Sequence, residues 1–513
     1  MAAFTLTACS ANHDVVATRS DSATSLTQPD ESVDSVPTTD GAEEPTPTDT
    51  ASVPPISLPT TTTQAPSEPD DPGGLVPTAD GAGDLLYPAL GNPGIDVVSY
   101  SVDLTYDHDA RALAGSVTLV VMPTEDRAEF TLDSSGPVVS RVAIDGVDAV
   151  FESGDPELRI APVTGLVRGQ QVEVRVEYTA TPDALARGVF PPTGWFNTID
   201  GSYVLNEPDG TRTWLPSNDH PSDKATWNFS VTVAAGVTAV ANGALVSSTD
   251  GPTGTTWVWR EDDPMPTYLV MLATGEYDLV EGTGPGGLPL LSAVLSSDRQ
   301  KVQPYLDSID DQIDFFDDFF GPYPLDRYGI AVTDSLGGLA METLGRSLFS
   351  RSDLNGDVGY LQDLLLSHEL AHQWFGDAVS PLSWQDIWLN ESFATYAEWM
   401  WLEHAGLTTL EDEAADALGQ RQASTGSPTG SPTAAELFSY NSYQGGALVL
   451  HALRRTIGDD KFFSVLQRWV SENNGTSRST DDFILLATEV GGVDLTALFD
   501  DWLYADILPA AFP

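Results

Sequence analysis

The spacing of the apolar residues changes near residue 282, and this change divides the chain into two parts of different fold class. Before it, apolar and polar residues alternate in short runs, as at 97–104, 115–121 and 172–178, a pattern typical of strands that bury one face. After it, the apolar residues recur with helical spacing. That spacing predicts helices at 302–320, 360–375, 392–404, 446–457 and 459–473.

We therefore predict an α+β protein with more than one domain, since 513 residues exceed what a single core supports. An antiparallel β-rich domain is expected at 89–280. A mostly α-helical domain is expected at 281–513, and its stretch 424–432, rich in Gly, Ser, Thr and Pro, is predicted to be a loop.

Two of the seven histidines, His368 and His372, lie four residues apart in the predicted helix 360–375, with Glu369 between them. At that spacing both imidazoles leave the same face of the helix, so they can bind one metal ion. After eighteen intervening residues, Glu391 offers a third ligand from the next helix and leaves a fourth position open for water. We predict one catalytic Zn2+ per chain, with Glu369 as the general base.

These motifs, taken in order with a Leu-Ala-Met-Glu-Thr run upstream, resemble the gluzincin aminopeptidases, the family of aminopeptidase N and leukotriene hydrolase. In that family a glycine-rich stretch ending in Met-Glu-Asn lies on an edge strand before the zinc helix. The resemblance implies a thermolysin-like catalytic domain in which Glu342 binds the free α-amino group of the substrate. It also implies that Ala340 and Met341 contact the substrate. A carboxylate that pairs with an ammonium at the end of a cleft selects free N-termini.

The resemblance implies two further site residues. Tyr443, which precedes the Gly-Ala-Leu run that begins at Gly446, matches the family's tyrosine that donates a hydrogen bond to the oxyanion, and Tyr440 is the competing candidate. Glu207, nine residues before Pro216, matches a Gln or Glu of the N-terminal domain that reaches the substrate amine. Six residues depart from the family pattern: Leu339 and Ser392 replace glycines, Thr343 an asparagine, Gly445 a basic residue, Ser217 a cysteine and His220 a glutamate.

Asp377 and Glu398 can support the metal ligands by accepting hydrogen bonds from imidazole or water, and they can equally be helix-cap or surface carboxylates. Other polar residues near these motifs have no metal-type partners in the sequence. We interpret these as structural: Ser217, His220, His404 and His451.

The formal net charge is −54, from 76 acidic and 22 basic side chains, and such a surface repels the phosphates of nucleic acids. The only cysteine, Cys9, follows Leu-Thr-Ala, which resembles a bacterial lipoprotein processing box, so residues 1–9 are interpreted as its remnant. Residues 10–88 are rich in Thr, Ser, Pro, Asp and Glu and predict a disordered linker with a reach on the order of 50 Å. We expect an extracytoplasmic protein, secreted or held at the cell surface, that touches a membrane only through a lipid at Cys9.

The expected activity is that of a monomeric zinc aminopeptidase acting on the N-termini of peptides or proteins. A thermolysin-like endopeptidase remains open because it shares the zinc chemistry, and so does a catalytically silent interaction module. Epoxide hydrolysis, known for one branch of the family, is not favoured. Because the chain ends soon after its last predicted helices, we also expect a more open cleft than in larger relatives.

Overall fold

The computed structural model describes residues 2–3, 81–184, 192–199, 201–334, 339–354 and 359–513. The predicted lipidation site at Cys9 and the predicted linker from 10 to 80 lie outside these residues. Residues 81–88, which the sequence pattern placed in the linker, pack instead against the body. Asp84 is buried, and its Oδ2 accepts a hydrogen bond from the backbone N of Trp384 at 2.7 Å. The predicted linker therefore extends eight residues, 81–88, into the described body, because the pattern does not show which polar residues become buried.

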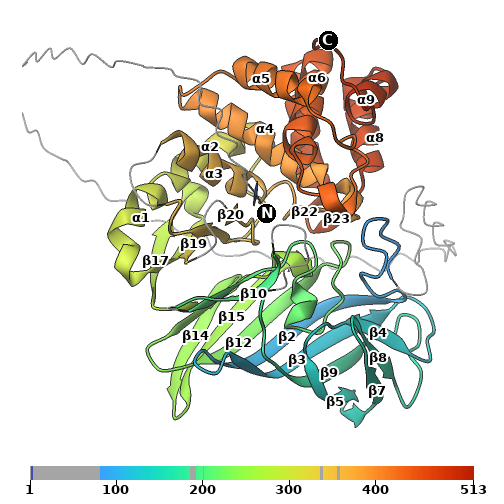
Figure 1. Ribbon diagram of the computed structural model, residues 1–513, viewed down its shortest axis with the longest axis vertical. Coiled ribbons are helices and arrows are strands. Elements are labelled where there is room, and N and C mark those ends of the chain that lie inside the picture. Colours follow the sequence, from blue (N-terminus) through green and yellow to red (C-terminus); the bar gives the residue numbers. More distant parts are fainter. Residues whose placement is uncertain (1, 4–80, 185–191, 200, 335–338, 355–358) are drawn as a thin grey trace, which may run out of the picture. The chain divides into compact units, whose positions relative to one another are not determined.

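The first part of the body contains a large twisted sheet whose strands run side by side (Figure 1). Its pairs are antiparallel except for one parallel pair, in which Thr226 lies opposite Ser99. The strand order in the described residues is β14 (Ala244–Gly251), β15 (Gly254–Met265), β12 (Ala225–Val233), β2 (Ile95–Asp107), β3 (Ala112–Pro123), β9 (Val172–Ala180), β5 (Val138–Ile144), β6 (Val147–Asp148).

Two smaller sheets complete this β domain. One has the order β10 (Gly194–Asn197), β11 (Ser202–Leu205), β16 (Leu272–Gly275), β13 (Thr238–Ala241). The other has the order β4 (Phe130–Asp133), β8 (Glu157–Ala161), β7 (Val150–Ser153).

The alternation that predicted strands also explains how the large sheet packs. Along β2, nearly every second side chain is buried, which is the period of a strand with one face on a core. Tyr100 of β2 stacks on Trp227 of the neighbouring strand with ring centroids 3.9 Å apart. Cross-strand aromatic pairs of this kind fix the register of neighbouring strands.

The second part begins at Tyr277, earlier than the predicted start at 281, because strand β17 (Tyr277–Thr283) joins a sheet whose other strands follow it in the chain. This four-stranded sheet has the order β17, β18 (Pro289–Leu295), β19 (Ile330–Thr333), β21 (Ser347–Ser350). The short β20 (Leu339–Ala340) pairs with β1 (Ala2–Ala3), and β22 (Val379–Pro381) pairs with β23 (Thr476–Arg478).

The helices of the second part are α1 (Arg299–Leu306), α2 (Ile309–Phe320), α3 (Tyr360–Ala371), α4 (Trp388–His404), α5 (Leu410–Ala423), α6 (Gly446–Ile457), α7 (Asp459–Asn473), α8 (Thr480–Gly491) and α9 (Thr496–Trp502). The predictions for α6 and α7 are confirmed to the residue, and 424–432 is outside the helices as expected.

The helix predicted at 302–320 is wrong as a single element, because the chain breaks between α1 and α2. The Ser308 hydroxyl bonds the Tyr305 carbonyl oxygen at 2.9 Å, a local bond that competes with the helical ones. The helix predicted at 392–404 begins four residues earlier, at Trp388, so Glu391 lies in its first turn.

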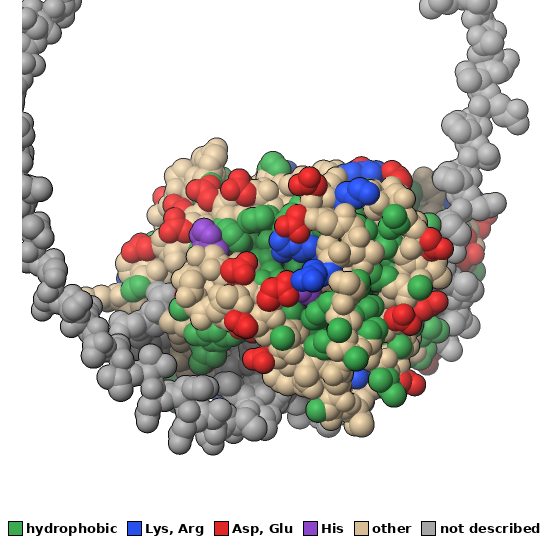
Figure 2. All heavy atoms as spheres, turned by 90° about the horizontal axis from the view of Figure 1, so that it is seen from above, with side chains coloured by type: hydrophobic (Ala, Val, Ile, Leu, Met, Phe, Trp, Pro, Cys, Tyr) green, Lys and Arg blue, Asp and Glu red, His purple; other side chains and the backbone are tan. Residues whose placement is uncertain are grey.

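The two helices that carry the predicted metal ligands form the centre of the second part. In α4, every residue from Trp388 to Leu402 is buried, and the second half of α3 is buried as well. On the face shown in Figure 2, acidic side chains are scattered among apolar and neutral ones. Among the described residues, no helix is both long and apolar enough to cross a membrane.

Candidate metal centre

The helix predicted at 360–375 ends at Ala371, so His372 is the C-terminal cap of α3 and not part of it. Even so, the side chains of His368 in α3, His372 at its end and Glu391 in α4 converge on one point. The Nε2 atoms of His368 and His372 lie 3.1 Å apart, and Oε2 of Glu391 lies 3.3 Å from the first and 3.5 Å from the second. All three residues are fully buried. Ligands of a tetrahedral zinc ion at bond lengths of about 2.0–2.1 Å are about 3.3 Å from one another. The three residues predicted as ligands therefore have the spacing that a zinc ion requires.

The other ring nitrogen of each histidine has an acceptor that fixes the orientation of the ring. His368 Nδ1 bonds the carboxylate of Glu398, and His372 Nδ1 bonds the backbone oxygen of Phe375 at 3.1 Å. Such partners hold Nε2 toward the metal and raise the basicity of the ligand. The structure thus places Glu398 where the supporting hypothesis required it.

Asp377 does not support a ligand through its side chain. Both of its carboxylate oxygens are buried and have no hydrogen-bond partner among the described residues. Burial, together with the nearby charge of Glu342, raises the pKa of Asp377 well above its usual range. Its backbone, however, belongs to the segment that follows the metal ligand His372.

The charges around the triad favour a cation. Burial alone would lower the pKa of His368, but the carboxylates of Glu398 and Glu391 outweigh it and raise this pKa to about 10. A site whose anions stabilise a positive charge this strongly is chemically suited to a divalent metal ion.

Glu369 lies beside the ligands without belonging to the triad. One of its carboxylate oxygens is within 4.8 Å of ligand atoms of both His372 and Glu342. Neither oxygen has a hydrogen-bond partner among the described residues. Burial and the charge of Glu342 raise the pKa of Glu369 to about 7, against the lowering effect of the two imidazoles. A carboxylate with a pKa near 7 is well suited to accept and return a proton.

A second group of carboxylates adjoins the metal ligands. Glu342 and Glu207 are fully buried, and one oxygen of each lies within 4.8 Å of an oxygen of Glu391. Burial and then the charge of Glu342 raise the pKa of Glu207 well above its usual range. Glu207 follows β11 in the β domain, whereas Glu342 follows β20, so the two domains jointly build an anionic pocket at one side of the metal centre.

The backbone next to Glu342 accepts an added strand. Ala340 belongs to β20, and Met341 bridges to Leu348 through hydrogen bonds of 2.9 and 2.7 Å. On its other side, β20 pairs antiparallel with β1, with Ala2 opposite Ala340 and Ala3 opposite Leu339. A peptide bound in this register directs its amino end toward Glu342, since β20 and the added strand run in opposite directions.

In the sequence, β20 precedes the triad and Tyr443 follows it. Tyr443 lies within a π-helical turn, η7 (Asn441–Gly445), that leads into α6. Its ring stacks on that of His368, with centroids 6.0 Å apart and planes inclined by 21°. Burial and then the charges of Glu391 and Glu207 raise the pKa of the Tyr443 phenol well above its usual range, so the phenol keeps its proton. Tyr440 instead donates to the Ala417 carbonyl oxygen at 3.3 Å, which leaves Tyr443 as the tyrosine at the metal centre.

Two of the departures from the family pattern are explained by packing around η7. Ser392 of α4 donates a hydrogen bond to the Ser442 carbonyl oxygen at 2.7 Å. A Cβ atom on Gly445 would lie 2.7 Å from Oγ1 of Thr429, so a basic side chain has no room there.

The three histidines that we interpreted as structural, His220, His404 and His451, contact neighbouring side chains. His220 Nδ1 bonds the Ser222 hydroxyl at 2.7 Å, and the ring of His404 packs on Phe315 with centroids 4.6 Å apart. His451 bonds the Tyr396 hydroxyl at 3.3 Å, and burial lowers its pKa to about 4. Ser217 lies in the β domain, where its backbone pairs with Asp133.

Sequence reasoning missed one residue that contacts both sides of the centre. Tyr268, in the short 3-10 helix η2 (Thr267–Leu269) of the β domain, is buried and donates to the Gly376 carbonyl oxygen at 3.0 Å. It also accepts a hydrogen bond from Nδ2 of Asn390 at 3.2 Å. No spacing in the sequence links Tyr268 to residues more than 100 positions away.

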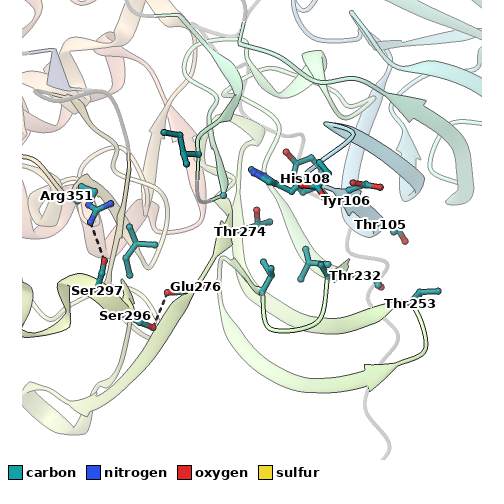
Figure 3. Close-up of a pocket in the computed structure, with 18 residues that line it drawn as sticks. Thr105, Tyr106, His108, Thr232, Thr253, Thr274, Glu276, Ser296, Ser297 and Arg351 are labelled. Carbon is teal, nitrogen blue, oxygen red and sulfur yellow. Dashed lines mark hydrogen bonds between the residues drawn. The ribbon is translucent and has the colours of Figure 1, made fainter.

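A cavity of about 720 Å³ lies elsewhere, between the ends of strands of the β domain and the start of the catalytic part (Figure 3). Tyr106, His108, Thr274 and Arg351 are among its lining residues. It contains neither the metal ligands nor the anionic pocket, so it is separate from the metal centre.

Two family models match the chain, one to each part of the body. The Peptidase M1 N-terminal domain matches residues 97–269, and the Peptidase family M1 domain matches residues 305–502. The first corresponds to the β domain, and the second contains the metal triad, Glu369 and Tyr443.

Curated relatives include the Probable aminopeptidase 2 of Sulfurisphaera tokodaii, 26% identical over 443 residues, a match that covers 82% of this chain and 54% of the relative. The Leucyl aminopeptidase of Saccharolobus solfataricus is 25% identical over 400 residues, a match that covers 74% of this chain and 50% of the relative. The chain thus spans about half the length of these curated relatives.

Two solved structures match this chain over almost their whole length. An M1 zinc metallopeptidase from Deinococcus radiodurans is 32% identical with a TM-score of 0.77, and the match covers 84% of this chain and 98% of that chain. A mutant M1 zinc metallopeptidase from the same organism, bound to the substrate Tyr-Ser-Ala, has 30% identity and a TM-score of 0.75, with the same coverage.

Proposed function

Because the chain belongs to peptidase family M1, we propose that it is a zinc-dependent aminopeptidase that hydrolyses the N-terminal bond of peptides. The observation that carries the proposal is the contact between two sites, a zinc triad and a pocket with two buried carboxylates. The triad alone suits any zinc hydrolase of this helix type. A pocket of carboxylates beside it adds a requirement for a cation on the substrate.

His368, His372 and Glu391 would hold the zinc ion. When bound, zinc supplies a Lewis acid that increases the acidity of water and polarises the carbonyl of the substrate. The remaining steps belong to side chains of this chain.

Glu369 accepts a proton from the attacking water and returns it to the leaving amine. Its carboxylate is close enough to the triad to do so, and its pKa of about 7 allows both transfers near neutral pH. Tyr443 keeps its proton and donates a hydrogen bond to the substrate oxygen as that oxygen becomes negative.

Glu342 and Glu207 select the substrate. A peptide that adds to β20 in the register of β1 brings its α-ammonium group toward Glu342, and Glu207 faces the same pocket from the β domain. An acylated N-terminus is neutral and would offer the buried Glu342 carboxylate no positive charge, which is energetically costly. The arrangement therefore favours free N-termini.

The proposal is tested with aminoacyl-amides and their N-acetylated counterparts. We expect the purified protein to hydrolyse the free amides, to lose this activity after treatment with a chelator, and to regain it with zinc. Release of internal fragments from an N-blocked peptide would identify an endopeptidase. Absence of hydrolysis in both sets, with zinc bound, would identify a silent interaction module.

We also propose that the enzyme acts outside the cytoplasm, on a tether behind Cys9. The support is the Leu-Thr-Ala-Cys sequence and the Thr-, Ser- and Pro-rich stretch after it. Metabolic labelling with a clickable fatty acid should mark the wild-type protein and not a Cys9→Ser variant. Equal labelling of both proteins contradicts the lipid anchor.

A further inference from the structure

The chain that follows His372 is bound to the β domain through its carbonyl groups. Lys224, just before β12, donates through Nζ to the carbonyl oxygens of Asp377 and Ala378 at 2.7 and 3.1 Å, and to the Ser380 hydroxyl at 3.1 Å. These three acceptors match the three N–H bonds of an ammonium group. The Tyr268 hydroxyl donates to the Gly376 carbonyl oxygen at 3.0 Å. Three consecutive carbonyl groups thus have donors in the β domain.

The next carbonyl group upstream, that of Phe375, accepts the hydrogen bond from Nδ1 of His372 at 3.1 Å. The four carbonyl groups from 375 to 378 therefore form one continuous strip of acceptors. Its first member orients the ring of a metal ligand, and the other three are held by another domain. A shift of the strip would change the direction in which Nε2 of His372 points.

The strip touches one of the ligands, His372, directly. Gly376 has φ = +124°, and a Cβ atom there would lie 3.3 Å from Nδ1 of His372 and 3.1 Å from the side-chain amide of Asn390. The backbone at this position therefore packs against the imidazole with no side chain between them.

Tyr268 extends the same support to the third ligand. Its hydroxyl accepts a hydrogen bond from Nδ2 of Asn390 at 3.2 Å, and Asn390 immediately precedes Glu391. The ring of Tyr268 packs edge-on against Trp384 with centroids 5.1 Å apart, just before α4 begins. One buried phenol thus connects the strip behind His372 to the helix turn that carries Glu391.

We propose that Tyr268 and Lys224 are positioning residues for the metal centre, so that the affinity for zinc depends on the β domain. Among the described residues, the hydrogen bonds of these two side chains go to backbone carbonyl groups, Ser380 and Asn390, and none goes to a metal ligand. Each holds backbone that orients a ligand. Removing a group that hydrogen-bonds a ligand directly changes metal affinity by about 10- to 100-fold, and for these residues, one step further from the metal, we expect the lower end of that range. The inference concerns metal binding alone and does not rest on the proposed peptidase activity.

The experiment measures the zinc dissociation constant of the full-length protein by competition with a chromophoric chelator, without substrate. Tyr268→Phe removes only a hydroxyl, and Lys224→Met removes the ammonium while keeping the length of the side chain. We expect the dissociation constant to rise about tenfold in each variant. The thermal midpoint of the metal-free protein should change little, and the increase in midpoint on adding zinc should become smaller.

Tyr178→Phe is the matched control. Tyr178 is also buried in the β domain, but its hydroxyl has no hydrogen-bond partner among the described residues. Its zinc affinity should equal that of the wild type. If Tyr268→Phe and Lys224→Met bind zinc as tightly as Tyr178→Phe, the inference is overturned. Equal losses of thermal midpoint with and without zinc would also overturn it, because a purely structural role predicts that result.

Discussion

The hydroxyl of Ser392 donates a hydrogen bond to the carbonyl oxygen of Ser442 at 2.7 Å, which ties the helix of a metal ligand to the turn of Tyr443. Ser392 directly follows Glu391 in α4, and Ser442 directly precedes Tyr443 in η7. The bond therefore sets the distance between the ligand helix and the phenol that would stabilise the oxyanion. A glycine at position 392 could not form it.

We expect Ser392→Ala to lower kcat by about tenfold, because small displacements of a catalytic group reduce the rate strongly. KM and zinc content should not change, since neither the anionic pocket nor the ligands are altered. Steady-state kinetics on an aminoacyl-amide checks this. In a Tyr443→Phe background the same substitution should have no further effect, and an additive loss there would show that Ser392 acts independently of Tyr443.

Gly446 is predicted to be indispensable because of Ser392. A Cβ atom at Gly446 would lie 1.7 Å from Oγ and 2.5 Å from Cβ of Ser392. Gly446→Ala should therefore lower the free energy of unfolding by about 1–3 kcal/mol, as overpacking does. Urea denaturation measures the change, and the Ser392→Gly background should reduce the loss.

Gly419→Ala is the control for this prediction. Gly419 lies in α5, and a Cβ atom there meets nothing within 4 Å. The substitution should raise stability by up to about 1 kcal/mol, since alanine is the better helix former. Equal effects at positions 446 and 419 would contradict the packing explanation.

Glu369→Gln should reduce kcat by about 10²- to 10⁴-fold, the range expected when a general base is lost. The amide has the same shape but cannot accept the proton. Zinc content, measured on the dialysed protein, should equal that of the wild type because Glu369 is not part of the triad. Loss of zinc in this variant would mean that Glu369 is a structural residue of the site.

Glu342→Gln should abolish the preference for free N-termini. We expect kcat/KM for an aminoacyl-amide to fall by about 100-fold, since the variant loses one partner of a buried charge pair. The corresponding value for the N-acetylated substrate should remain as low as in the wild type or rise. A uniform decrease for both substrates would indicate damage to the metal centre instead. Glu207→Gln should have the same direction of effect, because it faces the same pocket from the β domain.

We predict that the buried carboxyl of Glu261 makes the free energy of unfolding depend on pH. This residue of β15 is 2% exposed, and burial raises the pKa of its carboxyl from 4.5 to about 8. The folded state therefore holds a proton that the unfolded state releases at lower pH. Stability from this group is fully present below pH 4.5 and is lost as the pH rises through 8.

The difference in free energy of unfolding between Glu261→Gln and the wild type, measured in urea at a series of pH values, should grow between about pH 5 and 8 and then level off. The amide keeps the acceptor for the Asp263 backbone N, which Glu261 Oε1 binds at 2.9 Å. Asp262→Asn, at an exposed neighbouring position, should show no such trend. Parallel profiles for the two variants would contradict the assignment.

The elements predicted correctly are those whose signals are local. In β2 and β3 the period of two follows from burial of one sheet face, and in α6 and α7 the helical period follows from burial of one helix face. The break between α1 and α2 was missed because the apolar spacing continues across Ser308, whose hydroxyl bonds the preceding turn. The predicted boundary between 280 and 281 falls inside strand β17, because the pattern of a strand does not reveal its partner.

For the site, the sequence by itself determined the chemistry of the metal centre. His368 and His372 meet at one point whenever this helix forms, because His372 caps the helix with helical backbone angles and the helix geometry is fixed. Glu342, Glu207 and Tyr443 were located by resemblance, and the structure brings them to the same centre. Their roles remain predictions until the variants are measured.

Only the tertiary structure decided how that centre is held. Tyr268 reaches Gly376 and Asn390 across 108 and 122 positions of sequence, Lys224 reaches Asp377 across 153, and Ser392 reaches Ser442 across 50. None of these contacts follows from periodicity or spacing, because each depends on how whole elements pack. The sequence specifies which groups can bind and react, whereas the packing of two domains specifies where the backbone behind those groups is fixed.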